Sequence, residues 1–443
     1  MTGRLTAALS VVFFVSAAAA ASCTRPGAAQ PAATPGAPTI TMERIAEDYV
    51  RLVLAVGQHD ADYVDAYYGP PAWKTEAEKE KVPLETLARR ASDLSSSLAQ
   101  LTPPRDEMEQ LRFRYLQRQL EAVAARLRML RGERLTFDEE SKALYDAVAP
   151  AHPESHFQQI LDQLEQRFPG EGPLVDRYDA YRRAFVIPKE KLDHVFRTAI
   201  AACRERTVRH LTLPPGESFT VEYVTNKSWS GYNWYQGGFR SLIQVNTDLP
   251  IYIDRAIDLA CHEGYPGHHV YNVLLEKHLV KDRGWIEFTV YPLFSPQSLI
   301  AEGTANYGIE VAFPGDARVQ YEQQVLFPAA GLDPSLAREY YQVQALVERL
   351  SYAGNEAARR YINGAIDARQ AADWLEKYAL MPRARAEQRV RFFDQYRSYV
   401  INYNLGKDMV RLYIERLAAG SDETRWDVFG RLLSSPRLPS GLQ

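Results

Sequence analysis

The sequence predicts a mainly α fold with a small antiparallel β-sheet in the middle of the chain. Apolar residues recur at helical spacing from about residue 40 to 210, and helical patterns return from residue 299 onward. Between them lie two predicted strands: ESFTVEYV, which alternates apolar and polar positions, and GGFRSLIQVNTDLP, which opens with a glycine pair. The 443 residues, 46% of them hydrophobic, suffice for one large core or for two to three lobes that share an interface.

Residues 1–22 have the features of a secretory signal peptide. Arg4 precedes an apolar run at 11–15, too short to span a membrane as a stable helix, and small residues continue up to Cys23. Small residues before a cysteine are typical of bacterial lipoprotein processing, so we expect export to the cell envelope and a membrane anchor through lipid on Cys23. Cleavage by an ordinary signal peptidase is the alternative. Residues 23–40 are rich in proline and alanine, which predicts a flexible tether.

The rest of the chain divides into three predicted parts. An N-terminal helical lobe spans 41–210, with helices separated by prolines. The pattern of apolar residues changes from helical spacing to alternation after Leu213-Pro214-Pro215-Gly216. A catalytic region with the small sheet and a histidine motif spans 211–310. A C-terminal helical lobe spans 311–443.

Charge and cysteine content exclude some classes of protein. The net charge is only −4, with 52 basic residues spread among 56 acidic ones, so we expect no nucleic-acid partner. Cys203 and Cys261 remain after processing. They could pair in an oxidising envelope, but two cysteines do not make a disulfide scaffold, and two buried thiols are expected.

The second predicted strand leads into a helix that ends at the histidine motif. Asp248 can cap this helix, Pro250 suits its first turn, and Ile253 and Ile257 lie on its apolar stripe. The sheet is therefore expected beside the helix that carries the site.

Three of the nine histidines lie close together in CHEGYPGHH, at positions 262, 268 and 269. In a zinc helix of the H-E-x-x-H type the two histidines are four residues apart and share one face. Six residues of unbroken helix rotate a side chain by about 240° net, so His268 would face away from His262. Pro266 and Gly267 can interrupt the helix and return His268 toward His262. We therefore expect His262 and His268 to bind zinc, with His269 as the alternative second ligand.

A third ligand is expected from SLIAEGTANYGIE. Zinc held by two histidines commonly takes a glutamate from a second helix and leaves its fourth position to water. Glu302 is the best candidate, and Glu310 is the alternative, although a surface or supporting role suits it better. Asn306, one turn after Glu302, could accept a hydrogen bond from a ligand imidazole. The expected content is one zinc ion per chain.

These motifs resemble a known family. His262 to His269 match the H-E-x-x-P-G-H-H signature of the bacterial domain-of-unknown-function 885 family of zinc metallopeptidases, whose members are often secreted or lipid-anchored. EGTANY at 302–307 is similar to that family's E-G-W-A-x-Y, and to the E-G-F-A-x-Y stretch bearing the third zinc ligand of gluzincin aminopeptidases, with Thr304 in place of the aromatic residue. The resemblance extends more weakly over residues 40 to 430. It implies a multi-helical gluzincin-like metallopeptidase fold and a peptide substrate.

The resemblance also implies catalytic roles. SYVINYNLG near the C-terminus partly matches the family's P-G-Q-A-x-S-Y-x-x-G, and Tyr403 with Gly406 keeps the final spacing. Tyr403 would then donate a hydrogen bond to the developing oxyanion, helped by Tyr399 or His269. Glu263 would be the general base that activates water and returns the proton to the leaving amine. An extended peptide would pair with a strand from GGFRSLIQVN.

Two alternatives remain at this point. The chain could be a non-catalytic envelope lipoprotein that binds a ligand or partner, or a metal-dependent amidase acting on a non-peptide amide. The sequence does not distinguish exopeptidase from endopeptidase, and it is silent on oligomeric state.

Overall fold

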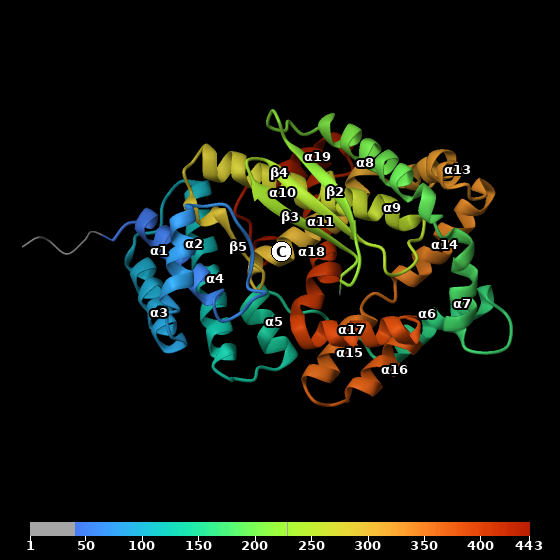
Figure 1. The fold of residues 1–443 in the computed structure, drawn as a ribbon, viewed down its shortest axis with the longest axis horizontal. Helices are drawn as coiled ribbons and strands as arrows, with labels where there is room; N and C mark the ends of the chain where they lie inside the picture. The colour runs from blue at the N-terminus through green and yellow to red at the C-terminus, as the bar shows by residue number, and fades with distance from the viewer. Residues whose placement is uncertain (1–39, 228) are drawn as a thin grey trace, which may run out of the picture. The chain divides into compact units, whose positions relative to one another are not determined.

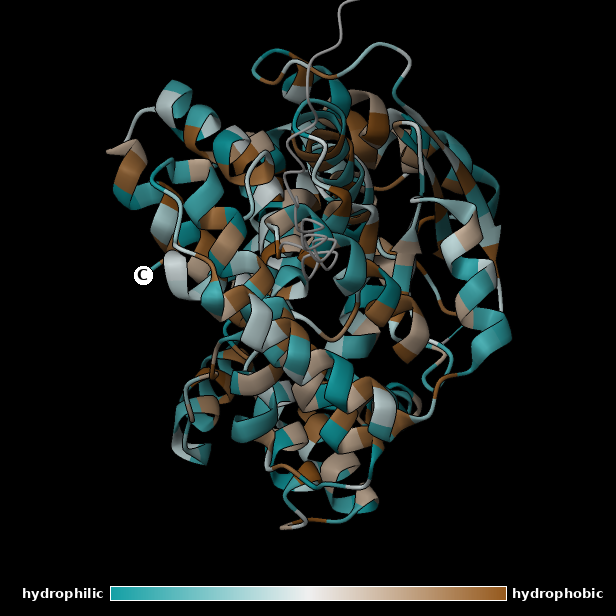
Figure 2. Ribbon diagram, turned by 90° about the vertical axis from the view of Figure 1, so that its left-hand side faces the viewer, coloured by the Kyte–Doolittle hydropathy of each residue, from teal (hydrophilic) through white to brown (hydrophobic). Residues whose placement is uncertain are grey.

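Helices make up most of the computed structural model, which describes residues 40–227 and 229–443 (Figure 1). The predicted mainly α class is confirmed. Residues Ile40–Gln443 form one compact unit. In Figure 2, hydrophilic and hydrophobic segments alternate along the helices, as expected for helices that bury one face.

The predicted signal peptide, Cys23 and most of the predicted tether lie outside the described residues. Within residues 40–227 and 229–443, no helix combines the length and the apolar character needed to cross a membrane.

The N-terminal helices begin where the sequence provides caps. The Thr41 side chain accepts a hydrogen bond from the Arg44 amide, and Thr136 forms a capping box with Glu139. The helices are α1 Met42–Val56, α2 Pro71–Glu80, α3 Leu84–Gln100, α4 Glu107–Leu130, α5 Phe137–Tyr145, α6 Glu154–Arg167, α7 Leu174–Arg182 and α8 Leu192–Val208.

Two small sheets lie in the fold. The larger one has the order β2-β4-β3, with β2 Ser218–Val224, β3 Gly231–Gly237 and β4 Arg240–Asn246. β3 and β4 are antiparallel, as expected of strands joined by a tight glycine turn, whereas β2 runs parallel to β4. The smaller sheet pairs β1 Val64–Tyr67 with β5 Val290–Pro292 in antiparallel fashion. The sequence predicted β2 and β4 but not β1, β3 or β5.

The helix after β4 is interrupted within the histidine motif. α9 Asp254–Leu259 continues as a π-helical turn over Ala260–Gly264, and α10 His268–Leu275 begins a new helix. The interruption follows from the sequence because Pro266 has no backbone N–H, and the Tyr265-Pro266 bond is cis. α10 in turn ends in a π-helical turn at Glu276–Lys281.

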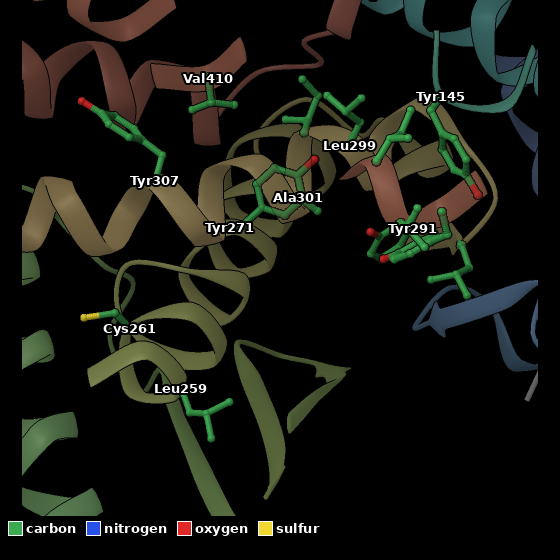
Figure 3. Packing of buried hydrophobic residues seen from close by; sticks show 14 of the residues in the cluster. Tyr145, Leu259, Cys261, Tyr271, Tyr291, Leu299, Ala301, Tyr307 and Val410 are labelled. Atoms are coloured by element: carbon green, nitrogen blue, oxygen red, sulfur yellow. The ribbon is translucent and has the colours of Figure 1, made fainter. Parts of the chain in front are cut away.

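The C-terminal part adds a helical layer around the buried helix α11 Pro296–Ala312. Figure 3 shows Leu299, Ala301 and Tyr307 along α11, with Val410 of α18 beside them. The remaining helices are α12 Ala317–Tyr321, α13 Phe327–Ala330, α14 Ala337–Glu348, α15 Ala353–Ile362, α16 Ala368–Tyr378, α17 Arg383–Tyr396, α18 Ile401–Ala418 and α19 Asp422–Leu433.

Glycines let α11 and α18 approach each other closely. A Cβ atom added to Gly303 would lie 2.5 Å from the carbonyl oxygen of Gly406, nearer than side chains allow. This contact fixes the distance between the helix that carries Glu302 and the helix that carries Tyr403.

Cys203 and Cys261 form a disulfide bond, so the expectation of two free thiols is wrong. α8 packs against the π-helical turn and brings together cysteines that are 58 residues apart. The bond attaches the residue directly before His262 to α8.

Candidate metal centre

The interrupted helix brings His262 and His268 together. Their Nε2 atoms lie 3.1 Å apart and their rings are perpendicular. Each side chain keeps 14% of its surface exposed, so water can reach the pair. Of the two candidate partners of His262, the structure places His268 beside it and turns His269 away.

Gly267 makes this geometry possible. Its N–H donates to the carbonyl oxygen of Cys261 over 2.9 Å. A Cβ atom built on Gly267 would lie 1.9 Å from the carbonyl oxygen of His262 and 2.4 Å from that of Cys261. Only a residue without a side chain fits between these two turns.

We expect Gly267→Ala to disrupt this turn. The added methyl group must displace main chain on either side of His262, at a cost of about 2–4 kcal/mol in the free energy of unfolding. Chemical denaturation of the purified mature chain measures this loss. Gly354→Ala is the matched control, because a Cβ atom there meets nothing within 4 Å. Unchanged stability of Gly267→Ala would contradict the geometry of the turn.

Glu302 reaches the two histidines from α11. Its Oε2 atom lies 3.4 Å from Nε2 of His262 and 3.8 Å from Nε2 of His268. That oxygen is buried and accepts no hydrogen bond from any described residue. An unpartnered buried carboxylate oxygen is costly unless a cation satisfies it, and two imidazole nitrogens with one carboxylate are a set that zinc prefers. The residues therefore fit a zinc ion.

Tyr399 holds the other oxygen of Glu302. Its hydroxyl donates to Oε1 of Glu302 over 2.9 Å, from the 3₁₀ turn Arg397–Val400 that leads into α18. This hydrogen bond orients the carboxylate toward the histidines, as partners of metal ligands commonly do. The prediction that Tyr399 would help to stabilise an oxyanion is therefore wrong.

The protonation states suit a cation site. Burial lowers the pKa of His268 to about 4, which leaves this imidazole neutral at neutral pH, the form that binds metals. Burial would raise the pKa of Glu302, but the nearby imidazoles of His262 and His268, together with the hydrogen bond from Tyr399, outweigh it and hold the pKa below its usual value. Burial opposes protonation of His262, yet the neighbouring carboxylates of Glu302 and Glu263 raise its pKa.

Glu263 lies beside His262 and His268, and strand β3 holds its main chain in place. One side-chain ligand atom each from His262, Glu263 and His268 lie within 4.8 Å of one another. The Asn233 amide of β3 donates to the Glu263 carbonyl over 2.7 Å, and a Cβ atom on Gly231 would lie 2.9 Å from Oε1 of Glu263. Burial raises the pKa of Glu263 to about 7, a value suited to a group that takes up and returns a proton near neutrality.

Tyr403 lies on α18, four residues after the tyrosine that bonds Glu302. Its ring packs edge-on against Tyr399 at a centroid distance of 5.7 Å. Burial, followed by the charges of Glu302 and Glu263, raises the pKa of Tyr403 well above its usual value, so its hydroxyl stays protonated. Within the described part of the chain, no hydrogen bond uses this hydroxyl, which leaves it available as a donor.

His269 points away from the site into a buried network. Its Nδ1 lies 2.9 Å from the Ser241 hydroxyl and its Nε2 lies 3.0 Å from Oε2 of Glu217. Glu217 also accepts from Tyr265 over 2.6 Å and from Arg204 over 2.7 Å, and these partners overcome burial and lower its pKa to about 2. The roles of alternative ligand and of oxyanion donor predicted for His269 are therefore wrong. The network instead fastens the histidine motif to the sheet and to α8.

Two other residues predicted for the zinc site, Asn306 and Glu310, have different roles in the structure. The Asn306 amide donates to the carbonyl oxygens of Glu302, over 2.9 Å, and Tyr403, over 3.4 Å, so it joins α11 to α18 and does not bond an imidazole. Glu310 is exposed and pairs with Lys407 over 2.9 Å, which excludes it as the third ligand and leaves it a surface carboxylate.

The predicted position for a bound peptide strand is also wrong. β4 is the central strand and is paired on both sides, so it has no free edge. The edge strands are β2 and β3, and β3 is the one that borders Glu263.

Sequence reasoning missed Glu217 and Asp65. Asp65 lies in β1, accepts a hydrogen bond from Tyr232, and has a pKa that burial raises to about 6, with the charge of Glu302 nearby. Neither residue belongs to a local motif, since their partners lie 52 and 167 positions away along the chain.

No family model and no curated protein match the sequence. Among solved structures, a candidate lipoprotein from Colwellia psychrerythraea is similar, with 15% identity, a TM-score of 0.49, and coverage of 91% of this chain and 75% of that one. A candidate lipoprotein of unknown function from Shewanella oneidensis has 13% identity, a TM-score of 0.42, and coverage of 84% and 75%. Neither likeness bears on chemistry, which depends on the residues of the site.

Proposed function

We propose that the protein is a zinc-dependent hydrolase of peptide bonds. One observation carries the proposal: the nitrogen atoms of His262 and His268 converge with an unpartnered, buried oxygen of Glu302. Glu263, which is buried and not needed as a ligand, lies beside them. This is the arrangement that activation of a water molecule for attack on an amide requires.

Each residue of the site has a role in the proposed mechanism. When bound by His262, His268 and Glu302, zinc supplies Lewis acidity to the attacking water and to the scissile carbonyl. Glu263 accepts the proton of the water and delivers it to the nitrogen of the leaving amine. The Tyr403 hydroxyl donates a hydrogen bond to the oxygen on which negative charge develops. The free edge of β3 holds the substrate backbone beside Glu263.

Tyr403→Phe is expected to lower kcat by about 10²–10³, because removal of one oxyanion donor commonly costs this much. KM should change little, since the hydrogen bond forms mainly in the transition state. Steady-state kinetics on a cleaved peptide measures both constants. Tyr413→Phe on the same helix is the control, and a Tyr403→Phe enzyme with unchanged kcat would remove Tyr403 from the mechanism.

Metal content and hydrolysis together test the proposal. The mature chain, residues 24–443, is purified and analysed by plasma mass spectrometry, and a mixed peptide library is digested with and without a chelator. We expect about one zinc ion per chain and cleavage that stops with the chelator and returns with zinc. No metal after zinc is supplied would favour a non-catalytic binding lipoprotein. Bound zinc with no peptide cleavage would favour hydrolysis of a non-peptide amide.

We also propose that the hydrolase acts at a membrane surface of the cell envelope, held there by lipid on Cys23. Cys23→Ser should release the protein from the membrane fraction. Continued membrane association of this variant would contradict the anchor.

A further inference from the structure

A group of four arginines includes three, Arg182, Arg385 and Arg389, that form no ion pair with any carboxylate in the described part of the chain. Arg182 ends α7, Arg255 lies on α9, and Arg385 and Arg389 lie one turn apart on α17. Arg383, at the start of α17, by contrast contacts three carboxylates, those of Asp373, Glu376 and Glu387.

Arg385 is exposed, and within residues 40–227 and 229–443 it makes no hydrogen bond or ion pair. Desolvation by the surrounding protein, and then the charges of Arg182 and Arg255, lower the pKa of Arg385, so both neighbours repel its positive charge. Such an arrangement is unfavourable in the free protein, and an anion bound between the groups would relieve it.

Arg182 adds a second, independent observation. Its guanidinium carbon lies 3.7 Å from the centre of the Tyr252 ring, and its Nε atom is buried without a hydrogen-bond partner among the described residues. Asp254 is a carboxylate near both Arg182 and Arg385, and its side chain already accepts a hydrogen bond from Tyr340 over 2.6 Å.

Two of the four arginines, Arg255 and Arg389, lie near residues of the candidate metal centre. Arg255 donates to Ser230 and to Asp258, each over 3.2 Å, and its charge opposes the rise that burial gives to the pKa of Glu263. On the next turn of α17, Arg389 lies 5.7 Å from the centre of the Tyr403 ring, and its Nε atom is also buried without a partner in the described chain. Arg255 and Arg389 thus place positive charge near Glu263 and Tyr403.

We propose that Arg385 and Arg389, supported by Arg182 and Arg255, bind a carboxylate of the substrate close to the bond that is cleaved. A guanidinium group matches a carboxylate through two parallel hydrogen bonds, which gives both affinity and orientation. The carboxylate is either the C-terminus of the peptide or an aspartate or glutamate side chain. The inference rests on the proposed function for its substrate, but binding alone can test it.

The test uses three forms of one acetylated, fluorescent octapeptide library that otherwise lacks acidic residues. The first form ends in a free carboxylate, the second in an amide, and the third in an amide but with one glutamate. Binding to the zinc-supplemented Glu263→Gln mature chain is measured by fluorescence anisotropy. We expect at least one carboxylate form to bind on the order of tenfold more tightly than the plain amide.

Variants connect this preference to the arginines. Arg385→Gln and Arg389→Gln should each reduce it, and Arg385→Lys, which keeps the charge but not the planar fork, should reduce it less. Arg391→Gln removes the same charge from an exposed position on the same helix and should leave it unchanged. Preference for the free C-terminus identifies the C-terminal carboxylate, and preference for the glutamate form identifies a side chain.

Equal binding of the three forms, no binding of any form, or a preference that survives both glutamine variants would overturn the inference. Cleavage of the free acid and the amide by the wild-type enzyme decides the proposed function separately. Zinc-dependent cleavage without a carboxylate preference would leave the hydrolase in place and remove only the carboxylate site.

Discussion

Glu263→Gln is expected to bind about one zinc ion per chain and to lose nearly all peptide hydrolysis. The amide has the shape of the carboxylate but cannot accept a proton from water or return one to the leaving amine, and general acid and base catalysis contributes about 10²–10⁴ to the rate. The three proposed ligands, His262, His268 and Glu302, are unchanged by this substitution. Plasma mass spectrometry and initial rates on the peptide library measure the two properties together.

Glu322→Gln provides a matched control for this variant. Glu322 is also buried, and its pKa is likewise raised to about 7 by burial, but its partner is Arg318 and it lies outside the site. Its substitution should leave the zinc content of the folded protein unchanged and the rate within a small factor. Full hydrolytic activity of Glu263→Gln would eliminate the proposed mechanism, whereas loss of zinc would reassign Glu263 as a ligand.

Glu302→Ala is expected to lose zinc and, with it, all hydrolysis. The substitution removes one of the three proposed protein ligands, so the affinity for zinc should fall by more than the roughly 10–100-fold that loss of a supporting partner costs. It also leaves the Tyr399 hydroxyl without the acceptor that it has in the wild type. Competition with a chromogenic chelator measures the dissociation constant of zinc.

Glu310→Ala is the control for this second variant, because Glu310 lies on the same helix but pairs at the surface with Lys407. It should keep wild-type affinity for zinc. The proposed ligand set would be wrong if Glu302→Ala bound zinc as tightly as the wild type, or if Glu310→Ala lost it.

The sequence was most informative where the chemistry is local. His262, Pro266, Gly267 and His268 lie within seven consecutive residues, so the helix break and its effect on the two histidines could be argued from backbone preferences alone. Glu302 could also be predicted, because zinc bound by two histidines needs a further ligand and a returning helix commonly supplies one. The structure brings these side chains together as expected.

The sequence was least informative about contacts that depend on long-range packing. The pairing of Cys203 with Cys261, the bond from Tyr399 to Glu302 and the burial of His269 against Glu217 all join segments far apart in the chain. The strand Gly231–Gly237 was missed because GYNWYQG has glycines at both ends and only a short alternating pattern, and its pairing with β4 stabilises it. Asn306 was misassigned because its distance from Glu302 along the helix did not reveal that its amide bonds main chain.

The part that α18 and the turn before it play in the site has a consequence for the synthesis and export of the chain. Tyr399 and Tyr403 belong to a segment that the ribosome makes long after the histidine motif, and a chain still being synthesised or threaded through a membrane has not yet supplied them. A precursor that is truncated before these tyrosines therefore lacks a complete site, whatever the state of its histidines. If the chain is the peptidase proposed above, the order of synthesis would disfavour self-digestion during export.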